Sequence, residues 1–589
     1  MVGISCDAAQ SKTVPPGFGQ DDFTNIVSYA RRYYLDPGSV DISRSYVGAA
    51  EAALKSLPYP LVLMSKSFYE KRSEIQDADR IMPGKVEKVG GSDEYLVFVP
   101  DYVQIDKRDK GITKRDRKLK LTPAQRAKRF AENRARIKKE QRFVESAWNQ
   151  VAFSKKDFQK IVKWISENRS RYNQPPSTYK GEHPYEKDPF GMHHVFFAAA
   201  NGFIQMMDPH SGILDRESWA RIRRESQDSS FEGIGALLRG GGTRDVVVET
   251  PLPGSPALKA GLRAGDIIRK VDGKTIESLP LSQVVKRIRG KKATVVALFV
   301  ERPTELRSLT IRIKRDVIEL KAVSSRYRAD EGLGILKISS FLYDTDRTSV
   351  AVRREYQALL RKAGKPLKGL IIDLRNNPGG DLDEAINTTG LFLPEDKVVV
   401  TIKSRNRTRN RRNRGEPMIP MRGGKSRFPV IVLINAGSAS ASEILASALM
   451  DHSAALVLGD RSFGKASVQG LQPRGDVILK LTTARYYAPK GYTIQVYGVQ
   501  PDIRVSDEPD GTFPPRFREE DMWRHLPELT RRKADSAREA WLEKLKAAVG
   551  KNEAAEQYLK KHKNDALKPD YMLTRALGYL KAMKRYPRP

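Results

Sequence analysis

Residues 430–469, VIVLINAGSASASEILASALMDHSAALVLGDRSFGKASVQ, decide the fold of the central part of this chain. The stretch opens with five apolar residues, mostly β-branched, which predict a buried strand at 430–434. The pattern breaks at 435–437, and a helix is predicted at about 441–452. A second apolar strand follows at 454–459. Strand, turn, helix and strand in this order indicate an α/β unit.

Reactive residue types gather at the two breaks in this pattern. Three serines crowd the turn before the helix, where a hydroxyl can cap the helix and face its positive end: Ser438, Ser440 and Ser442. Lys465 and Gln469 lie in the Gly-punctuated loop after the second strand. A serine hydroxyl is unreactive until a base takes its proton, and a lysine is a base only when its amine is neutral. The layout therefore predicts a hydrolase, with the reacting serine still open.

The composition indicates a globular protein of three or four domains without metal chemistry. The chain has 589 residues, 39% of them hydrophobic and 30% charged. It contains no apolar run of the length, about 18 residues, that a membrane span needs. The single cysteine, Cys6, excludes intramolecular disulfides and cysteine metal clusters, and the seven histidines form no HExxH pattern. We therefore expect no cofactor and no bound metal.

The net charge of +34 is concentrated in two segments. Residues 107–142 hold sixteen Lys or Arg against four acidic residues, and residues 402–415 hold seven Lys or Arg and no acid. Such segments attract polyanions such as nucleic acid, anionic lipid or cell-surface polymers. The alternative, which we favour, is a solvated helix face and a flexible exposed loop, with at most a weak polyanion contact.

The amino terminus resembles no complete export signal. A secretory signal needs a basic segment and then 7–15 apolar residues, and residues 1–6 are too short for that. Cys6 could instead end a lipoprotein signal that starts upstream. Against this, Gly3 stands where a larger aliphatic residue is expected.

Helical periodicity dominates residues 1–228. Helices are predicted near 20–34, 43–56 and 155–168. A basic insertion covers about 84–150, with a short strand at 95–99 and a long helix that begins at a Thr122-Pro123 cap.

Residues 229–303 change to strand periodicity and resemble a PDZ domain. Three motifs occur in order: GIG at 233–235, SPALKAGLRAGD at 255–266 and the turn VDG at 271–273. PDZ domains hold a peptide's terminal carboxylate on backbone N–H groups of a glycine loop and add the peptide as a strand. The resemblance implies that the peptide-binding loop is formed by Gly233, Ile234 and Gly235.

Beyond this block, strands at 332–340 and 369–374 flank a helix near 350–362, and a further helix starts at about Leu382. Strands alternating with helices imply a largely parallel sheet. Residues 508–589 contain helical segments at about 534–549, 552–562 and after Pro569.

Three motifs then identify a family: NNPGG at 376–380, GSASASE at 437–443 and FGKASVQ at 463–469. Behind a PDZ-like block, they resemble the carboxyl-terminal processing (tail-specific) serine proteases, and the likeness runs from about 208, at DPHS, to 505. The resemblance implies a multidomain α+β fold. An α/β (crotonase-like ββα) protease core at 304–507 would carry an inserted PDZ-like domain at 229–303 and helical regions at 1–228 and 508–589.

The family's pattern assigns roles to residues of this chain. Its nucleophile lies 25 positions before the motif lysine, which implies Ser440 with Lys465 as base and Gln469 orienting the amine, so that Ser438 and Ser442 are structural. The oxyanion would be bound by backbone N–H groups of Ala441 and of Gly379 or Gly380. Ala466-Ser467 replaces the commoner Gly-Thr.

Three other residues could take part in the chemistry. His210 and His452 are not excluded as bases by the sequence, although a structural role in a turn is favoured for His210. Asp451, eleven residues after Ser440, matches an acid of some family members, and we expect it on the helix surface.

The resemblance implies a serine endopeptidase that recognises protein C-terminal tails through its PDZ domain, in a bacterial cell envelope or periplasm. An adaptor or self-association is possible, and the PDZ domain could gate the site. Two alternatives are a catalytically silent PDZ scaffold that binds tails, and a basic polyanion-binding protein. The intact Ser440, Lys465 and Gln469 argue against the first. The lack of aromatic interleaving among the basic residues argues against the second.

Overall fold

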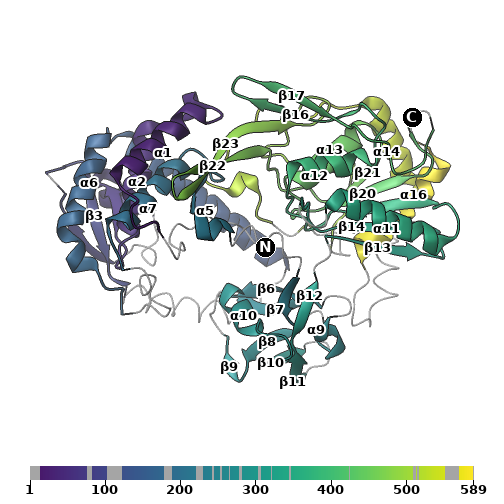
Figure 1. Ribbon diagram of the computed structural model, residues 1–589, viewed down its shortest axis with the longest axis horizontal. Helices are drawn as coiled ribbons and strands as arrows, with labels where there is room; N and C mark the ends of the chain where they lie inside the picture. Colours follow the sequence, from purple (N-terminus) through teal and green to yellow (C-terminus); the bar gives the residue numbers. More distant parts are fainter. Residues whose placement is uncertain are drawn as a thin grey trace.

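The computed structural model describes residues 14–587 with gaps at 76–82, 90, 103–122, 178–188, 221–229, 242–243, 252–254, 264–265, 277–280, 303–306, 320–321, 344–346, 423–424, 508–512, 514–515 and 551–569. Cys6, Thr122 and the helix predicted at 552–562 lie outside the described residues. Figure 1 shows a helical N-terminal part at one side, a helix-covered sheet at the other and a small antiparallel domain below them. None of the described helices combines the length and the apolar character needed to cross a bilayer.

The central sheet has six strands in the order β13-β14-β15-β20-β21-β24, and every pairing except that of β13 with β14 is parallel. Its strands are β13 (Val323–Arg328), β14 (Leu333–Ile338), β15 (Gly369–Asp373), β20 (Val430–Ile434), β21 (Leu456–Gly459) and β24 (Ile503–Arg504). The predicted parallel sheet and the strand at 430–434 are confirmed. All five residues of β20 are buried, which explains their unbroken apolar pattern.

Helices cover both faces of this sheet. On one face lie α11 (Thr348–Ala363), α12 (Leu382–Gly390) and α13 (Ala441–Asp451). On the other face, α14 (Ser536–Val549) and α16 (Tyr571–Arg585) pack against residues of β14, β15, β20 and β21. The predicted helices at 534–549 and after Pro569 are confirmed, and they complete the hydrophobic core.

A second, antiparallel sheet has the order β17-β16-β23-β22, with β4 paired to β23. The strands are β4 (Gly212–Asp215), β16 (Val398–Ser404), β17 (Thr408–Arg412), β22 (Ser467–Arg474) and β23 (Val477–Tyr487). Two expectations are thereby wrong. Residues 402–415 are not a flexible loop, because most of them belong to the β16–β17 hairpin. Gln469 lies in a strand rather than a loop, because β22 pairs with the long strand β23.

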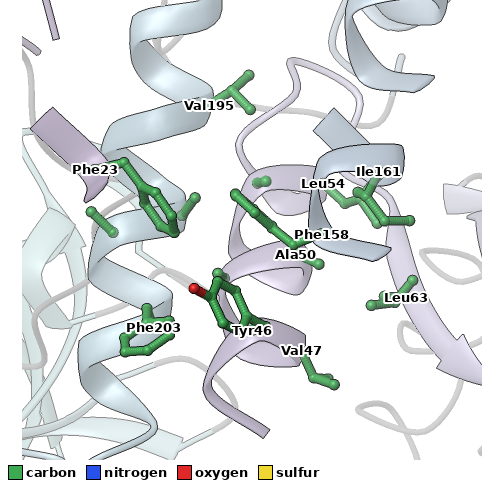
Figure 2. Packing of buried hydrophobic residues seen from close by; sticks show 14 of the residues in the cluster. Phe23, Tyr46, Val47, Ala50, Leu54, Leu63, Phe158, Ile161, Val195 and Phe203 are labelled. Carbon is green, nitrogen blue, oxygen red and sulfur yellow. The ribbon is translucent and has the colours of Figure 1, made fainter. Parts of the chain in front are cut away.

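The N-terminal part is mainly helical, as predicted. The helices described over their whole length are α1 (Gln20–Tyr33), α2 (Ile42–Lys55), α3 (Lys66–Ile75), α5 (Pro123–Asn149), α6 (Lys155–Asn168) and α7 (Met192–Gln205), with 3-10 turns η2 (Pro37–Ser39) and η4 (Arg169–Tyr172). A three-stranded sheet joins β1 (Val62–Ser65), β2 (Gly84–Glu87) and β3 (Tyr95–Pro100). Figure 2 shows the core, in which Phe23 stacks on Phe158 at 4.9 Å and Tyr46 meets Phe203 edge-on at 5.1 Å. Three buried residues of β23, Val477, Leu479 and Leu481, belong to this same core.

The small domain is antiparallel, with strand order β11-β10-β8-β7-β6. Its elements are β5 (Ser230–Gly233), β6 (Ala236–Gly241), β7 (Arg244–Pro251), α9 (Pro256–Lys259), β8 (Ile267–Val271), β9 (Lys274–Thr275), α10 (Leu281–Ile288), β10 (Val295–Arg302), β11 (Arg307–Lys314) and β12 (Asp316–Glu319). The remaining short elements of the chain are β18 (Met421–Arg422), β19 (Lys425–Ser426) and η6 (Glu519–Asp521). Strand β6 lies at the edge of the sheet, and α10 contacts it.

Candidate active site

Ser440 lies at the sharp turn between β20 and α13. Its backbone has φ 54° and ψ −112°, a conformation that non-glycine residues rarely adopt and that typically costs about 1–3 kcal/mol. The turn is held by Glu443, whose Oε2 accepts a hydrogen bond from the N–H of Ser440 at 2.8 Å. This strained geometry, at the start of a helix, is typical of a residue whose side chain has a function.

The two flanking serines are engaged elsewhere. The Ser438 hydroxyl donates to the carbonyl of Leu374 at 2.8 Å, and the Ser442 hydroxyl donates to the carbonyl of Asn377 at 2.9 Å. Both side chains are fully buried. They tie the turn to the loop that follows β15, which is a structural role.

Lys465 lies in the loop before β22. Its Nζ donates to Oε1 of Gln469 at 3.0 Å and to the carbonyl of Ser467 at 3.3 Å, and among the described contacts it has none with Ser440 Oγ. Burial of the amine lowers the pKa of Lys465 to about 8, and the positive charge of Lys480 acts in the same direction. The amine is therefore partly neutral near physiological pH, as a general base requires.

Glu443 and Tyr486 join the serine loop to the lysine loop. Oε2 of Glu443 accepts the N–H groups of both Ser440 and Lys465, at 2.8 and 3.0 Å. Its Oε1 accepts the N–H of Gly464 at 2.7 Å, and burial raises the pKa of this carboxyl to about 7. The Tyr486 hydroxyl contacts the carbonyl oxygens of Ser440, at 3.1 Å, and of Lys465. The backbones of Ser440 and Lys465 are thus held by the same two side chains.

Neither Glu443 nor Tyr486 was among the site residues predicted from the sequence. The spacing of Ser440 and Glu443, a Ser-x-x-Glu capping box, contained the signal for Glu443. Nothing in the local sequence marks Tyr486, because its role depends on the pairing of β23 with β22 and β16.

The double glycine of NNPGG approaches Ser440 closely. A Cβ on Gly379 would lie 2.8 Å from the Cβ of Ser440 and 2.9 Å from the nitrogen of Ala441. The N–H of Gly379 donates to Oδ1 of Asn377 at 2.9 Å, so it is already occupied. For the N–H groups of Gly380 and Ala441 we find no acceptor in the described part of the chain. These two remain as donors for an oxyanion.

Sequence comparison gives this geometry its family. The model of peptidase family S41 matches residues 332–505, and a PDZ-domain model matches residues 247–302. A carboxy-terminal-processing protease of Bartonella bacilliformis is 41% identical over 308 residues, which cover 52% of this chain and 68% of that protein. The chain belongs to peptidase family S41. It is a serine-type, carboxy-terminal-processing peptidase with a PDZ domain, as the sequence motifs predicted.

Two further relatives of this S41 peptidase have lower sequence identity. A probable CtpA-like serine protease of Staphylococcus aureus is 35% identical over 311 residues, covering 52% of this chain and 59% of the relative. The solved photosystem II D1 C-terminal processing protease is 29% identical with a TM-score of 0.38, covering 55% of this chain and 84% of that one. The chain thus spans about three fifths of the staphylococcal relative.

The structure corrects the placement of Asp451. We expected an acid on the helix surface, but Asp451 is only 7% exposed because every residue of α13 is buried. Its carboxylate accepts the N–H of Lys490 at 3.0 Å and the hydroxyl of Tyr492 at 3.1 Å, and Arg532 lies 3.4 Å away. It stabilises the far end of α13 and not the serine end.

The two histidines have different surroundings. His452 follows the last residue of α13, at the opposite end from Ser440, and its Nε2 lies 2.7 Å from the carbonyl of Val398. His210 lies in the turn before β4, with Nε2 2.9 Å from both carboxylate oxygens of Glu519. The position of His452 therefore argues against a role as base for Ser440.

The GIG loop lies between β5 and β6. Ile234 is buried in the domain core, and its carbonyl accepts the N–H of Ala257 at 2.8 Å. Gly235 has φ +72°, and a Cβ there would lie 2.5 Å from the Cβ of Ser255. Gly233 pairs with Asp316 of β12, the strand that follows β11 in the chain.

Proposed function

We propose that this S41 peptidase hydrolyses peptide bonds with Ser440 as nucleophile, Lys465 as general base and Gln469 as the residue that orients the amine. One observation carries the proposal. An amine whose pKa burial lowers to about 8 belongs to a loop that shares the Glu443 carboxylate and the Tyr486 hydroxyl with the strained turn of Ser440.

The chemistry follows from these groups. Neutral Lys465 takes the proton of Ser440 as Oγ attacks the scissile carbonyl, and N–H groups of Ala441 and Gly380 bind the resulting oxyanion. The ammonium then protonates the leaving amine, and an acyl-enzyme remains. Water, deprotonated by Lys465, hydrolyses it, and the proton returns to Ser440. Gly379 contributes its small size, since any side chain there would push against Ser440.

Substrate selection would come from the PDZ domain. Strand β6 is the free edge of its sheet, beside α10, and the loop formed by Gly233, Ile234 and Gly235 leads into it. A C-terminal tail would add as a strand to β6, with its carboxylate at this loop. We propose unfolded protein tails as substrates and the cell envelope as the place of action.

The predicted division at 228, 303 and 507 remains our proposal for the domain limits. The proposed function is compatible with self-association and with a weak polyanion contact through residues 107–142 and 402–415.

Cleavage of an unfolded protein with a short apolar C-terminal tail tests the proposal. The wild type should cut it, and Ser440→Ala and Lys465→Ala should each abolish cutting while tail binding persists. Ser438→Ala is the matched control. Loss of activity in Ser438→Ala with full activity in Ser440→Ala would overturn the assignment. Tail binding by the wild type without any turnover would instead indicate the silent scaffold.

A further inference from the structure

Two buried carboxylates from outside the S41 motifs converge on the loop of Lys465. Asp208 lies in the DPHS turn that follows α7, and Glu519 begins the 3-10 turn η6, more than fifty residues beyond Lys465. Both side chains are fully buried. His210 connects them. Its backbone N–H donates to Oδ1 of Asp208 at 2.8 Å, and Nε2 of its imidazole ring lies 2.9 Å from the carboxylate of Glu519.

Asp208, through Thr482, helps to set the orientation of the Gln469 amide, whose Nε2 also donates to Oγ of Ser467 at 2.9 Å. An ionised carboxylate only accepts hydrogen bonds, so the Thr482 hydroxyl donates to Oδ1 of Asp208, at 3.1 Å. The Thr482 oxygen can then accept the amide N–H of Gln469, also at 3.1 Å. This leaves Oε1 of Gln469 facing Nζ of Lys465 at 3.0 Å. The donor and acceptor roles in this series of hydrogen bonds are therefore set by Asp208 and passed through Thr482 and Gln469 to Lys465.

Glu519 acts in the same way on the backbone around Lys465. Its carboxylate accepts the amide N–H of Gln495 at 2.8 Å, which leaves the Gln495 oxygen to accept the N–H of Ala466 at 2.9 Å. Its own N–H donates to the carbonyl of Phe463 at 3.2 Å. The residues on either side of the Gly464-Lys465 pair are therefore both held by Glu519.

The turn η6 is itself anchored to the N-terminal part. Arg134 of α5 forms ion pairs with Glu520 and Asp521, at 3.0 Å for Glu520. The indole N–H of Trp523 donates to Glu145 of α5 at 3.1 Å. The basic helix α5, for which the sequence suggested only a solvated face, thus helps to place Glu519.

We propose that Asp208, through Thr482 and Gln469, and Glu519, through Gln495, are positioning residues that orient Lys465, with His210 as the link between them. The N-terminal part then helps to position the catalytic base Lys465, because it contains Asp208 and contacts the turn of Glu519. This inference rests on the proposed role of Lys465.

The charges that face Lys465 give the inference a second signature. They are Asp208, Glu443 of α13, Glu519 of η6 and Lys480 of β23, and the three carboxylates raise the pKa of Lys465 while Lys480 lowers it. Glu519→Gln removes one of the raising charges. The rising limb of its activity profile, set by deprotonation of Lys465, should therefore move to lower pH, a shift that a general loss of folded protein would not produce.

Three variants test the positioning: Thr482→Val, Asp208→Asn and Glu519→Gln, with Thr482→Ser as the conservative rescue. A displacement of the base by about 1 Å typically costs about 100-fold, so we expect kcat to fall about 10- to 100-fold with KM for a tailed substrate little changed. Thr482→Ser should retain most of the activity. A fourth variant, His210→Gln, removes the ring nitrogen that contacts Glu519 and should lower kcat in the same way. His452→Gln, at the far end of α13, is its matched histidine control and should behave like the wild type.

The outcomes separate the inference from the proposed function. An active Lys465→Ala overturns the function and the inference together. An inactive Lys465→Ala, with kcat and pH midpoint of Thr482→Val and Glu519→Gln equal to those of the wild type, overturns the inference alone. If Glu519→Gln fails to fold, Thr482→Val decides, since it keeps the volume of the side chain and every charge. A circular dichroism spectrum like that of the wild type and a cooperative unfolding transition in denaturant confirm that each scored variant is folded.

Discussion

Gly379→Ala adds one methyl group at the point where the NNPGG loop meets Ser440, and it removes no chemical group. The Cβ would lie 2.8 Å from the carbonyl oxygen of Ala439, 2.8 Å from the Cβ of Ser440 and 2.9 Å from the nitrogen of Ala441, all closer than ordinary contact. Two of these atoms are backbone and cannot rotate away. The loop or the serine turn must therefore shift.

The expected magnitude has two parts. Gly379 has φ +102°, and such a conformation costs a residue with a side chain about 1–3 kcal/mol. Overpacking adds about 1–3 kcal/mol, so the free energy of unfolding should fall by about 2–6 kcal/mol. A displacement of Ser440 by a fraction of an ångström up to about 1 Å should lower kcat by up to about 100-fold.

Gly491→Ala separates the two parts. Gly491 has φ +85°, and a Cβ there meets nothing within 4 Å, so only the conformational cost of about 1–3 kcal/mol applies. Denaturant unfolding and peptide cleavage should be measured for both variants. If Gly379→Ala matched Gly491→Ala in stability and kept full kcat, close approach of the glycine to Ser440 would not be required, and the reasoning would be refuted.

Three further predictions concern the base, the shared tyrosine and the peptide loop. Because only the neutral amine accepts a proton, kcat/KM should rise with pH through about 8, the pKa of Lys465, and a flat profile from pH 5 to 10 would contradict a lysine base. Tyr486→Phe leaves two carbonyl groups without their hydroxyl partner, so unfolding free energy should fall by about 1–3 kcal/mol and kcat by about tenfold. An unchanged kcat would remove Tyr486 from the site. Gly235→Val would clash with Ser255 and should raise KM for tailed substrates about tenfold without lowering the cleavage of a short tail-free peptide, which tests where tails bind.

The central strand and helix could be predicted because their burial leaves a direct trace in the sequence. Strand β20 is buried on both faces, so its five residues are all apolar, and α13 begins after Ser440, whose N–H donates to the Glu443 carboxylate three residues later. The motif spacing likewise distinguished Ser440 from Ser438 and Ser442. The hydroxyl contacts of these two with Leu374 and Asn377 agree with that choice.

The errors arose where burial or pairing comes from distant segments. Asp451 looks like a surface residue in the sequence of its own helix, but Arg532 and Tyr492 arrive from elsewhere to surround it. Residues 402–415 look like a solvated loop because they are rich in arginine. They belong instead to the hairpin of β16 and β17, which is held in a larger sheet because β16 also pairs with β23, about 80 residues further along the chain.

The individual central strands, the strand-to-helix turn of Ser440 and the motifs that contain Ser440 and Lys465 could be recognised in the sequence, since each depends on residues close together in the chain. The contacts that hold Lys465, by contrast, depend on the tertiary structure. The hydrogen bond from Thr482 to Asp208 joins residues 274 positions apart, and that from Gln495 to Glu519 joins residues 24 positions apart on different elements. Buried polar groups must be satisfied by whichever partners the fold supplies, so local sequence does not identify such partners.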